Sequence, residues 1–270
     1  TGADFHKGAP MSIPFTKSTL AIGRDRLQRI YQACERPVGL ENLAFAYSID
    51  EVKIHGEFLH ALIEPVNGFI ILDLHNVYCQ MKNFGIDDDT ILHLFPLERV
   101  REIHISGGSW ESSSYEPKRQ IRRDTHDDAV PEEVFQLLTA ALKVCPNVKF
   151  VVFEQVGPGL VTPLQQLQYQ ADFMRMREII EEHDGVAQEK EQNDFLPRFI
   201  SETGEPKEDE NLFEQQRALT YILENAPDYQ QPSQMLADSA LANSSWKIEH
   251  WDPSMLETAM KIAQKWKGAN

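Results

Sequence analysis

Short apolar runs alternate with longer amphipathic stretches along the first two thirds of this sequence, and no other feature constrains the fold as strongly. Between the runs, apolar residues recur at helical spacing, as they do from Val134 to Leu142. The runs are rich in Val, Ile, Leu and Phe, and they cover Val38–Leu43, Phe69–Leu74, Val100–Ile105 and Val148–Glu154. Strands that alternate with helices predict an α/β fold built on a parallel sheet.

Polar residues at the strand ends favour a TIM (β/α)₈ barrel over a doubly wound sheet, although periodicity alone leaves both open. A barrel gathers such residues at its C-terminal mouth, whereas a doubly wound nucleotide-binding sheet normally carries a glycine-rich phosphate loop. The sequence contains neither GxGxxG nor GxxxxGK[ST]. Four strands, with a fifth predicted at Arg122–His126, fall short of the eight that close a barrel. We therefore expect a TIM barrel that lacks its first β/α units in this chain.

The polar run from Asp184 to Asp194 predicts a linker between two domains. Residues 1–185 would form the C-terminal portion of the barrel, and residues 186–270 a small helical domain. Helices are expected there at Leu212–Leu223, Met235–Leu241 and Met255–Trp266. The sequence thus predicts a barrel followed by a helical appendage.

Charge and cysteine content exclude several functional classes. The 42 acidic and 26 basic residues give a formal net charge of −16, which disfavours nucleic acid and anionic membranes as partners. The apolar runs are far shorter than the roughly 20 residues that span a bilayer. The three cysteines form no CxxC pair, and no secretory signal is visible, so we expect a cytoplasmic protein.

Metal-ligating residue types follow the strand ends in order. They are Glu41 in GLEN, Asp73 and Asn76 in DLHN, His104 in EIHISGG, Asp124 and His126 in DTH, and Glu154 in VVFE. Carboxylates suit hard cations, and imidazole suits iron, manganese and zinc, so this mixed set predicts a multinuclear metal centre. A metal would also offset the cost of burying several carboxylates together.

Each ligand type also has a simpler structural interpretation. Glu41 alone would often be a capping or ion-paired carboxylate, His104 alone a core histidine, and Asp124 with His126 a plain ion pair. The combined pattern favours the metal site. His75 would share the Asp73 face in strict alternation, so it could ligate metal, hydrogen-bond a ligand, or simply fill its position; we rank it below Asp73 and Asn76 as a ligand.

Two other groups near the predicted mouth are interpreted as surface. The basic cluster of Arg119, Arg122 and Arg123 is expected to be a solvated loop rather than a subsite for an acidic peptide. His6 could substitute for a missing metal ligand, but its context HKGAP suits a surface loop equally well, and we favour the loop. Neither group is included in the predicted metal site.

The ordered motifs resemble the multinuclear non-haem iron-dependent oxidative enzyme family, over about Pro10 to Gly159. The matching motifs are IPFT at Ile13–Thr16, RPVGLEN at Arg36–Asn42, LDLHNVY at Leu72–Tyr78, HISGG at His104–Gly108 and the RDTHD block. The ligand order is also similar to that of the wider xylose isomerase-like barrel superfamily, with Asn76 where that superfamily has histidine.

The resemblance implies two or three iron ions, activation of dioxygen, and oxidative modification of cysteine or another side chain of a ribosomally made peptide. It also implies a partner protein that presents the peptide. The family usually supplies two further metal histidines from earlier strands, and we expect both to precede this chain. No catalytic residue is assigned.

Two other functional classes stay open at this stage. Zinc or manganese at the same ligands would suit a hydrolase or isomerase, because such metals lower the pKa of bound water. A degenerate barrel with a helical tail would instead act as a binding module.

Overall fold

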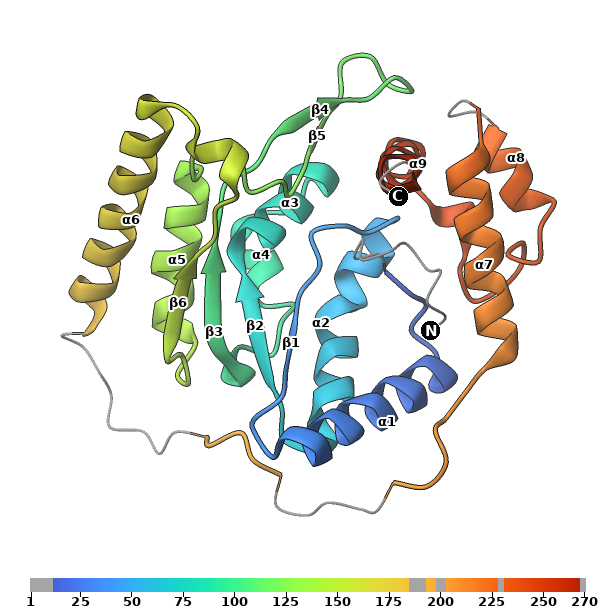
Figure 1. The fold of residues 1–270 in the computed structure, drawn as a ribbon, viewed down its shortest axis with the longest axis horizontal. Coiled ribbons are helices and arrows are strands. Elements are labelled where there is room, and N and C mark those ends of the chain that lie inside the picture. The colour runs from blue at the N-terminus through green and yellow to red at the C-terminus, as the bar shows by residue number, and fades with distance from the viewer. Residues whose placement is uncertain (1–11, 185–192, 198–202, 228–230, 268–270) are drawn as a thin grey trace.

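The computed structural model describes residues 12–184, 193–197, 203–227 and 231–267. Four parallel strands form the central sheet in the order β1-β2-β3-β6 (Figure 1). They are β1 (Gly39–Glu41), β2 (Phe69–Asp73), β3 (Val100–Ile105) and β6 (Phe150–Phe153). The predicted α/β class and parallel sheet are confirmed. Within the described residues the sheet has open edges at β1 and β6, so these strands alone do not close a barrel.

Helices follow the strands and cover the sheet. They are α1 (Lys17–Cys34), α2 (Ile49–Ile63), α3 (Leu74–Phe84), α4 (Asp88–Leu92), α5 (Glu132–Val144) and α6 (Pro163–Asp184). Local signals set their starts: Thr16 and Thr19 form a capping box at α1, and the Ser48 hydroxyl accepts from the Glu51 N–H at α2. The main core joins these helices to fully buried strand residues such as Ile70, Leu72 and Ile103.

The fifth strand predicted at Arg122–His126 is wrong. Residues 120–122 form β5 (Gln120–Arg122), which pairs antiparallel with β4 (Trp110–Ser112) outside the parallel sheet. The Asn83 side chain satisfies the backbone groups of Arg122 that a neighbouring strand of the parallel sheet would otherwise bind. It accepts from the Arg122 N–H at 2.7 Å and donates to the Arg122 carbonyl at 3.0 Å. His126 then adopts a φ of 52°, which ends any extended conformation.

Three helices follow α6: α7 (Glu210–Asn225), α8 (Gln231–Ala237) and α9 (Pro253–Lys267). The predicted helices at 212–223 and 255–266 are confirmed, whereas the one predicted at 235–241 ends at Ala237. The linker predicted at 184–194 lies largely outside the described residues. The domain boundary at 185 and 186 stays a prediction.

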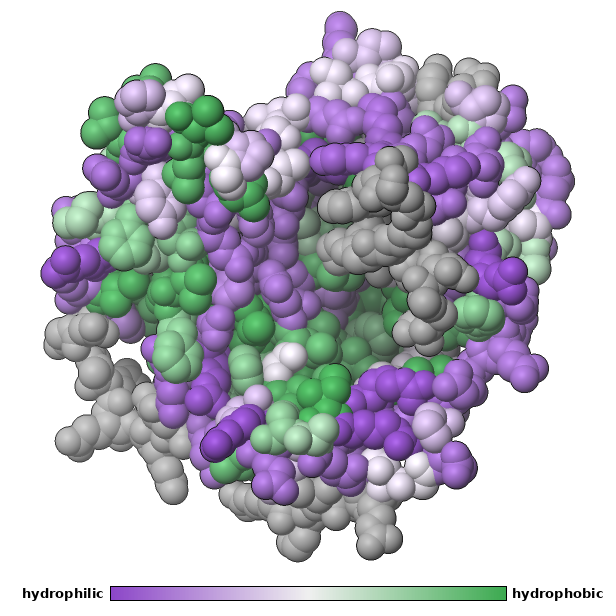
Figure 2. Space-filling model, in the orientation of Figure 1, coloured by the Kyte–Doolittle hydropathy of each residue, from purple (hydrophilic) through white to green (hydrophobic). Residues whose placement is uncertain are grey.

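The C-terminal helices pack against the α/β part through a second apolar cluster. Phe45, Tyr47 and Ile121 from the α/β part are buried against residues of α7 and α9. Tyr47 stacks on Trp251 with ring centroids 3.7 Å apart. Figure 2 shows a hollow on the viewed face, between the sheet side of the molecule and the C-terminal helices, with hydrophobic residues on its floor.

None of the helices in the described part of the chain combines the length and apolar character needed to span a bilayer. All three cysteines fall in that part and are unbridged, with Cys34 exposed and Cys79 and Cys145 buried.

Candidate metal centre

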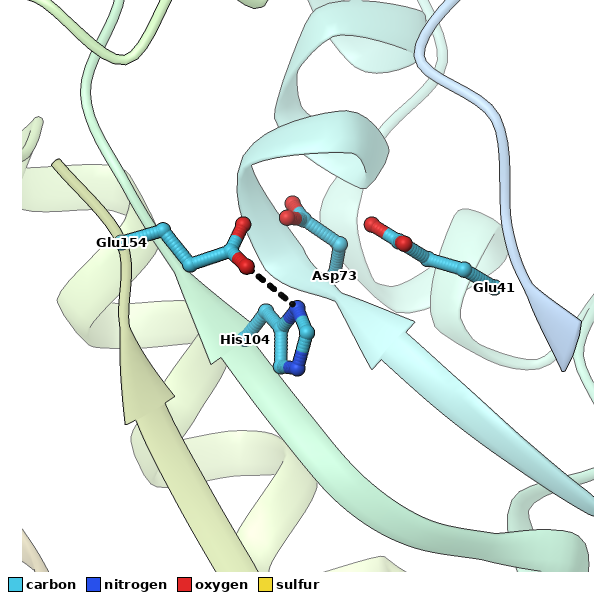
Figure 3. A group of neighbouring side chains, drawn as sticks. All are labelled: Glu41, Asp73, His104 and Glu154. Carbon is cyan, nitrogen blue, oxygen red and sulfur yellow. Dashed lines mark ion pairs between the residues drawn. The ribbon is translucent and has the colours of Figure 1, made fainter. Parts of the chain in front are cut away.

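Four of the predicted ligands converge at the carboxyl ends of the parallel strands. Glu41 ends β1, Asp73 ends β2, His104 lies near the end of β3, and Glu154 directly follows β6. One ligand atom from each residue lies within 4.8 Å of the others. Figure 3 shows the four side chains directed toward one shared space. Parallel register explains this, because Asp73 pairs with His104 across β2 and β3.

Asp73 serves as the helix cap of α3 while leaving one oxygen unused. Its Oδ1 accepts from the Asn76 N–H at 2.7 Å, which satisfies the first turn of the helix. Its Oδ2 is buried without a hydrogen-bond partner in the structure. Burial raises the pKa of Asp73 to about 8, with help from the Asp124, Glu41 and Glu154 carboxylates.

Asn76 lies beside Glu41 and has an unused acceptor of its own. Its Nδ2 donates to the Asn42 carbonyl at 2.9 Å and lies 3.4 Å from Glu41 Oε1. Asn76 Oδ1 is buried without a hydrogen-bond partner. The amide is therefore held by its nitrogen, with its oxygen available to a cation.

His104 is held between two carboxylates. Its Nε2 lies 2.7 Å from Glu102 Oε1, and its Nδ1 lies 3.3 Å from Glu154 Oε1. Burial lowers the pKa of His104, but the interactions with Glu154 and Glu102 outweigh burial and raise it to about 9. The sequence analysis missed Glu102, although its position two residues before His104 places both on one face of β3.

Asp124 and His126 form a second group that meets the first at Glu154. His126 Nε2 lies 2.9 Å from Asp124 Oδ1 and 3.7 Å from Glu154 Oε2. The Asp124 carboxylate raises the pKa of His126 to about 9. Burial raises the pKa of Asp124, but the hydrogen bonds with His126 and His75 outweigh burial and lower it. All seven predicted residues therefore lie close together, in two adjoining groups.

His75, left open by the sequence, faces Asp124 and is not among the four converging side chains. Its Nδ1 lies 3.0 Å from Asp124 Oδ1, and Arg122 Nε donates to its Nε2 at 3.1 Å. Because the arginine can only donate, Nε2 is the acceptor and Nδ1–H donates to Asp124. His75 therefore orients a candidate ligand, as the outer-shell partner of a metal ligand commonly does.

The expectation that the basic cluster is a solvated loop is wrong. Arg122 is buried against His75, and Arg119 Nη1 lies 2.8 Å from Asp252 Oδ2. Arg123 pairs with Glu111. Arg119 and Arg122 thus connect the β4–β5 hairpin to its surroundings, whereas the Arg123 pair with Glu111 of β4 lies within the hairpin. His6 lies outside the described residues.

The chemistry of these groups suits a metal ion. Without a cation, Glu41, Asp73, Asp124 and Glu154 bring four carboxylates together, and burial already raises the pKa of Glu41 and Asp73. Asp73 Oδ2 and Asn76 Oδ1 are buried at this place without hydrogen-bond partners. Such unsatisfied acceptors are rare unless a ligand or ion serves them.

A cavity of about 820 Å³ opens over the candidate ligands. Its lining includes Glu41, Asn76, Asp124, His126 and Glu154 on the strand side. Side chains of α9 line it as well, from a part of the chain far away in sequence. The volume falls in the range of about 300–1,000 Å³ that is typical of ligand sites.

Comparison with known proteins gives a consistent result. The model of a family described as "RiPP precursor modification enzyme MbnB/TglH/ChrH" matches residues 3–172. A UPF0276 protein of Shewanella loihica is 30% identical over 128 residues, which are 47% of this chain and 44% of the relative. A UPF0276 protein of Chromobacterium violaceum is 27% identical over 154 residues, covering 56% of this chain and 53% of the relative. The chain thus spans about half the length of the curated relatives it matches.

Proposed function

The chain belongs to the RiPP precursor modification enzyme family MbnB/TglH/ChrH, and from this premise we propose that it is part of a multinuclear non-haem iron oxidase or oxygenase. It would use dioxygen to modify cysteine or another side chain of a ribosomally made peptide. A partner protein would present that peptide.

The observation that carries this proposal is the convergence of Glu41, Asp73, His104 and Glu154 within 4.8 Å. We propose that these four residues and Asn76 hold one part of the metal centre. Asp124 and His126 would hold the adjoining part, with Glu154 shared between the two. Oxygen-rich ligands with imidazole suit iron and also manganese or zinc. The ligand set therefore supports a metal enzyme but does not by itself distinguish among these three metals.

Bound iron would supply the one-electron chemistry that activates dioxygen. The residues of this chain would hold and orient it. Asp73 caps α3 with Oδ1, and this hydrogen bond fixes the direction in which its other oxygen points. His75 donates to Asp124 and thereby fixes which way that carboxylate faces. The Asn76 amide holds its place through the Asn42 carbonyl.

We further propose that the four-stranded sheet is part of a TIM barrel, with residues 1–185 as the barrel portion and 186–270 as a helical domain. Closure would need strands beyond those of the described residues. Such strands would also supply the two further metal histidines that the family resemblance implies. The length of the relatives, about twice the matched segment, is consistent with this arrangement.

The proposal is tested by counting metal atoms per chain in protein purified without oxygen. Two or three irons support the oxidative enzyme. Stoichiometric zinc or manganese without iron would favour the hydrolase or isomerase, and absence of bound metal would favour a binding module. Each of the last two results would overturn the proposed function.

Variants then test the ligand assignment. His126→Ala and Glu154→Ala should each lower the metal content without a matching loss of folded protein, because each removes a direct ligand. Asp128→Ala is the matched control, since Asp128 is exposed and two residues from His126. Equal metal content in both ligand variants and the control would sink the assignment.

A further inference from the structure

Helix α9 lies outside the family match at residues 3–172, yet it forms a wall of the cavity that holds the candidate metal ligands. We propose that α9 and the segment 43–45 form a subsite for an apolar side chain of the peptide substrate, beside the residue that is modified. This inference rests on the function proposed above and adds a substrate preference to it.

The cavity lining combines charged and apolar residues. Carboxylates of Glu41, Asp124 and Glu154 belong to it, and so do the cations Arg122, Arg123 and Lys265. Its apolar residues include Phe45, Ile121, Met255 and Ile262, which pack in one apolar cluster. An apolar side chain gains free energy by leaving water for such a cluster. A polar or acidic side chain placed against the same cluster would lose its hydration.

Ile262 is the apolar residue of α9 best placed to contact a ligand. Met255 and Ile121 line the cavity but are each only 1% exposed, so most of their surface already packs within the protein. Ile262 is partly buried against the same apolar cluster and lines the cavity too. Its side chain therefore has surface left to offer a substrate.

The wall is fixed in position before any substrate arrives. Glu257 of α9 accepts from the Ser114 N–H at 2.9 Å, and Lys261 lies 2.8 Å from Glu111 of β4. Arg119 joins the hairpin to Asp252, directly before the helix. A preformed wall discriminates between ligands without a cost of ordering the protein, and this favours selectivity at this site.

The cavity also has room for more than the residue that reacts. Its volume of about 820 Å³ lies near the upper end of the usual range for ligand sites. A peptide that places one side chain at the metal ligands would thus carry a neighbouring side chain toward α9. The neighbour is the part of the substrate that α9 would select.

Two synthetic peptides test the subsite: Ac-Gly-Leu-Cys-Leu-Gly-amide and Ac-Gly-Ser-Cys-Ser-Gly-amide. Both carry the same thiol, and the symmetric design places the tested side chain on either side of it. Binding to zinc-loaded protein is measured by titration calorimetry, so that no turnover is needed. The wild-type protein should prefer the leucine peptide by about tenfold, the usual value of a modest apolar contact.

Ile262→Asp should reduce the preference to about twofold or less, because it places a charge in the apolar wall. Ile262→Ala should reduce it in the same direction and covers the case in which the Asp variant does not fold. Ile30→Asp is the matched control, since Ile30 is 52% exposed on α1 and does not line the cavity. It should keep the wild-type preference.

Equal affinity of wild-type protein for the two peptides, or no binding of either, would overturn the subsite. So would an undiminished preference in a folded Ile262 variant. The iron content of wild-type protein purified without oxygen is measured alongside, so failure of the proposed function is seen separately, as wild-type protein without two or three irons per chain.

Discussion

Replacing Glu257 by Gln should weaken the attachment of α9 to the hairpin that borders the cavity. The Glu257 side chain is buried, and its carboxylate accepts from the Ser113 hydroxyl at 2.9 Å and from the Ser114 and Tyr115 N–H groups. Lys261 Nζ completes the environment at 2.9 Å. Gln would present an amide NH₂ to these donors in place of one carboxylate oxygen, so at least one donor would lose its partner.

The size of the effect follows from the pKa of Glu257. Burial raises this pKa, but the interactions with Lys261, Ser114 and Ser113 outweigh burial and lower it from 4.5 to about 2. Since a tenfold change in an ionisation constant is worth about 1.4 kcal/mol, this pKa corresponds to roughly 3 kcal/mol of stability. For a chain of this size that amounts to a fall of roughly 6 to 12 °C in Tm.

The lowered pKa of Glu257 also determines the direction in which the free energy of unfolding changes with pH. A carboxyl whose pKa is lowered in the folded state contributes stability that is fully present above about pH 4.5 and is lost as pH falls toward 2. The difference between wild-type protein and Glu257→Gln should therefore be constant from pH 7 to 5 and shrink below that range.

Urea unfolding at a series of pH values measures this difference directly. Glu249→Gln is the matched control, because Glu249 is exposed in the same C-terminal region, and it should change the free energy of unfolding by no more than about 0.5 kcal/mol. A Glu257→Gln variant as stable as the control at pH 7 would refute the reasoning. A loss that does not shrink in acid would show that the charge is not its source.

Three further predictions concern the metal centre and the fold. His75→Phe removes the donor to Asp124, so metal affinity should fall about tenfold or more in a chelator competition assay; an unchanged affinity would show that His75 does not orient this ligand. Burial raises the pKa of Asp73 to about 8, so metal binding should displace a proton and strengthen from pH 6 to pH 8; a flat profile in metal titrations would contradict this. At Gly56 a Cβ would lie 1.9 Å from the Leu94 carbonyl oxygen, so Gly56→Ala should cost about 2 kcal/mol or more; an unchanged urea midpoint would disprove that contact.

The convergence of these side chains could be predicted from the sequence, because the alternation of strands and helices fixes the direction of the strands as well as the fold class. Parallel strands all end at one edge, so residues that follow the strands meet there. Asp73 and His104 are direct neighbours for this reason. The metal assignment of these residues stays a prediction that the elemental analysis will test.

The predictions that failed depended on contacts between distant segments. The strand expected at 122–126 is replaced by a hairpin, because the Asn83 side chain binds the Arg122 backbone. The basic cluster was predicted to be a solvated loop, but Arg122 donates a hydrogen bond to His75 and Arg119 forms an ion pair with Asp252. A local sequence pattern does not indicate which hydrogen-bond or ion-pair partner a side chain finds tens of residues away.

The sequence by itself determined the α/β class, the order of the candidate ligands and the family resemblance, because periodicity and motif spacing are local properties of the chain. Only the tertiary structure decided that His75 turns toward Asp124 and that Glu154 adjoins both ligand groups. It also decided that side chains of α9 and the candidate ligands line one cavity. The physical reason is that these relations arise from packing between residues up to about two hundred positions apart. Such packing depends on which side chains are buried together, and the spacing of residues in the sequence does not contain that information.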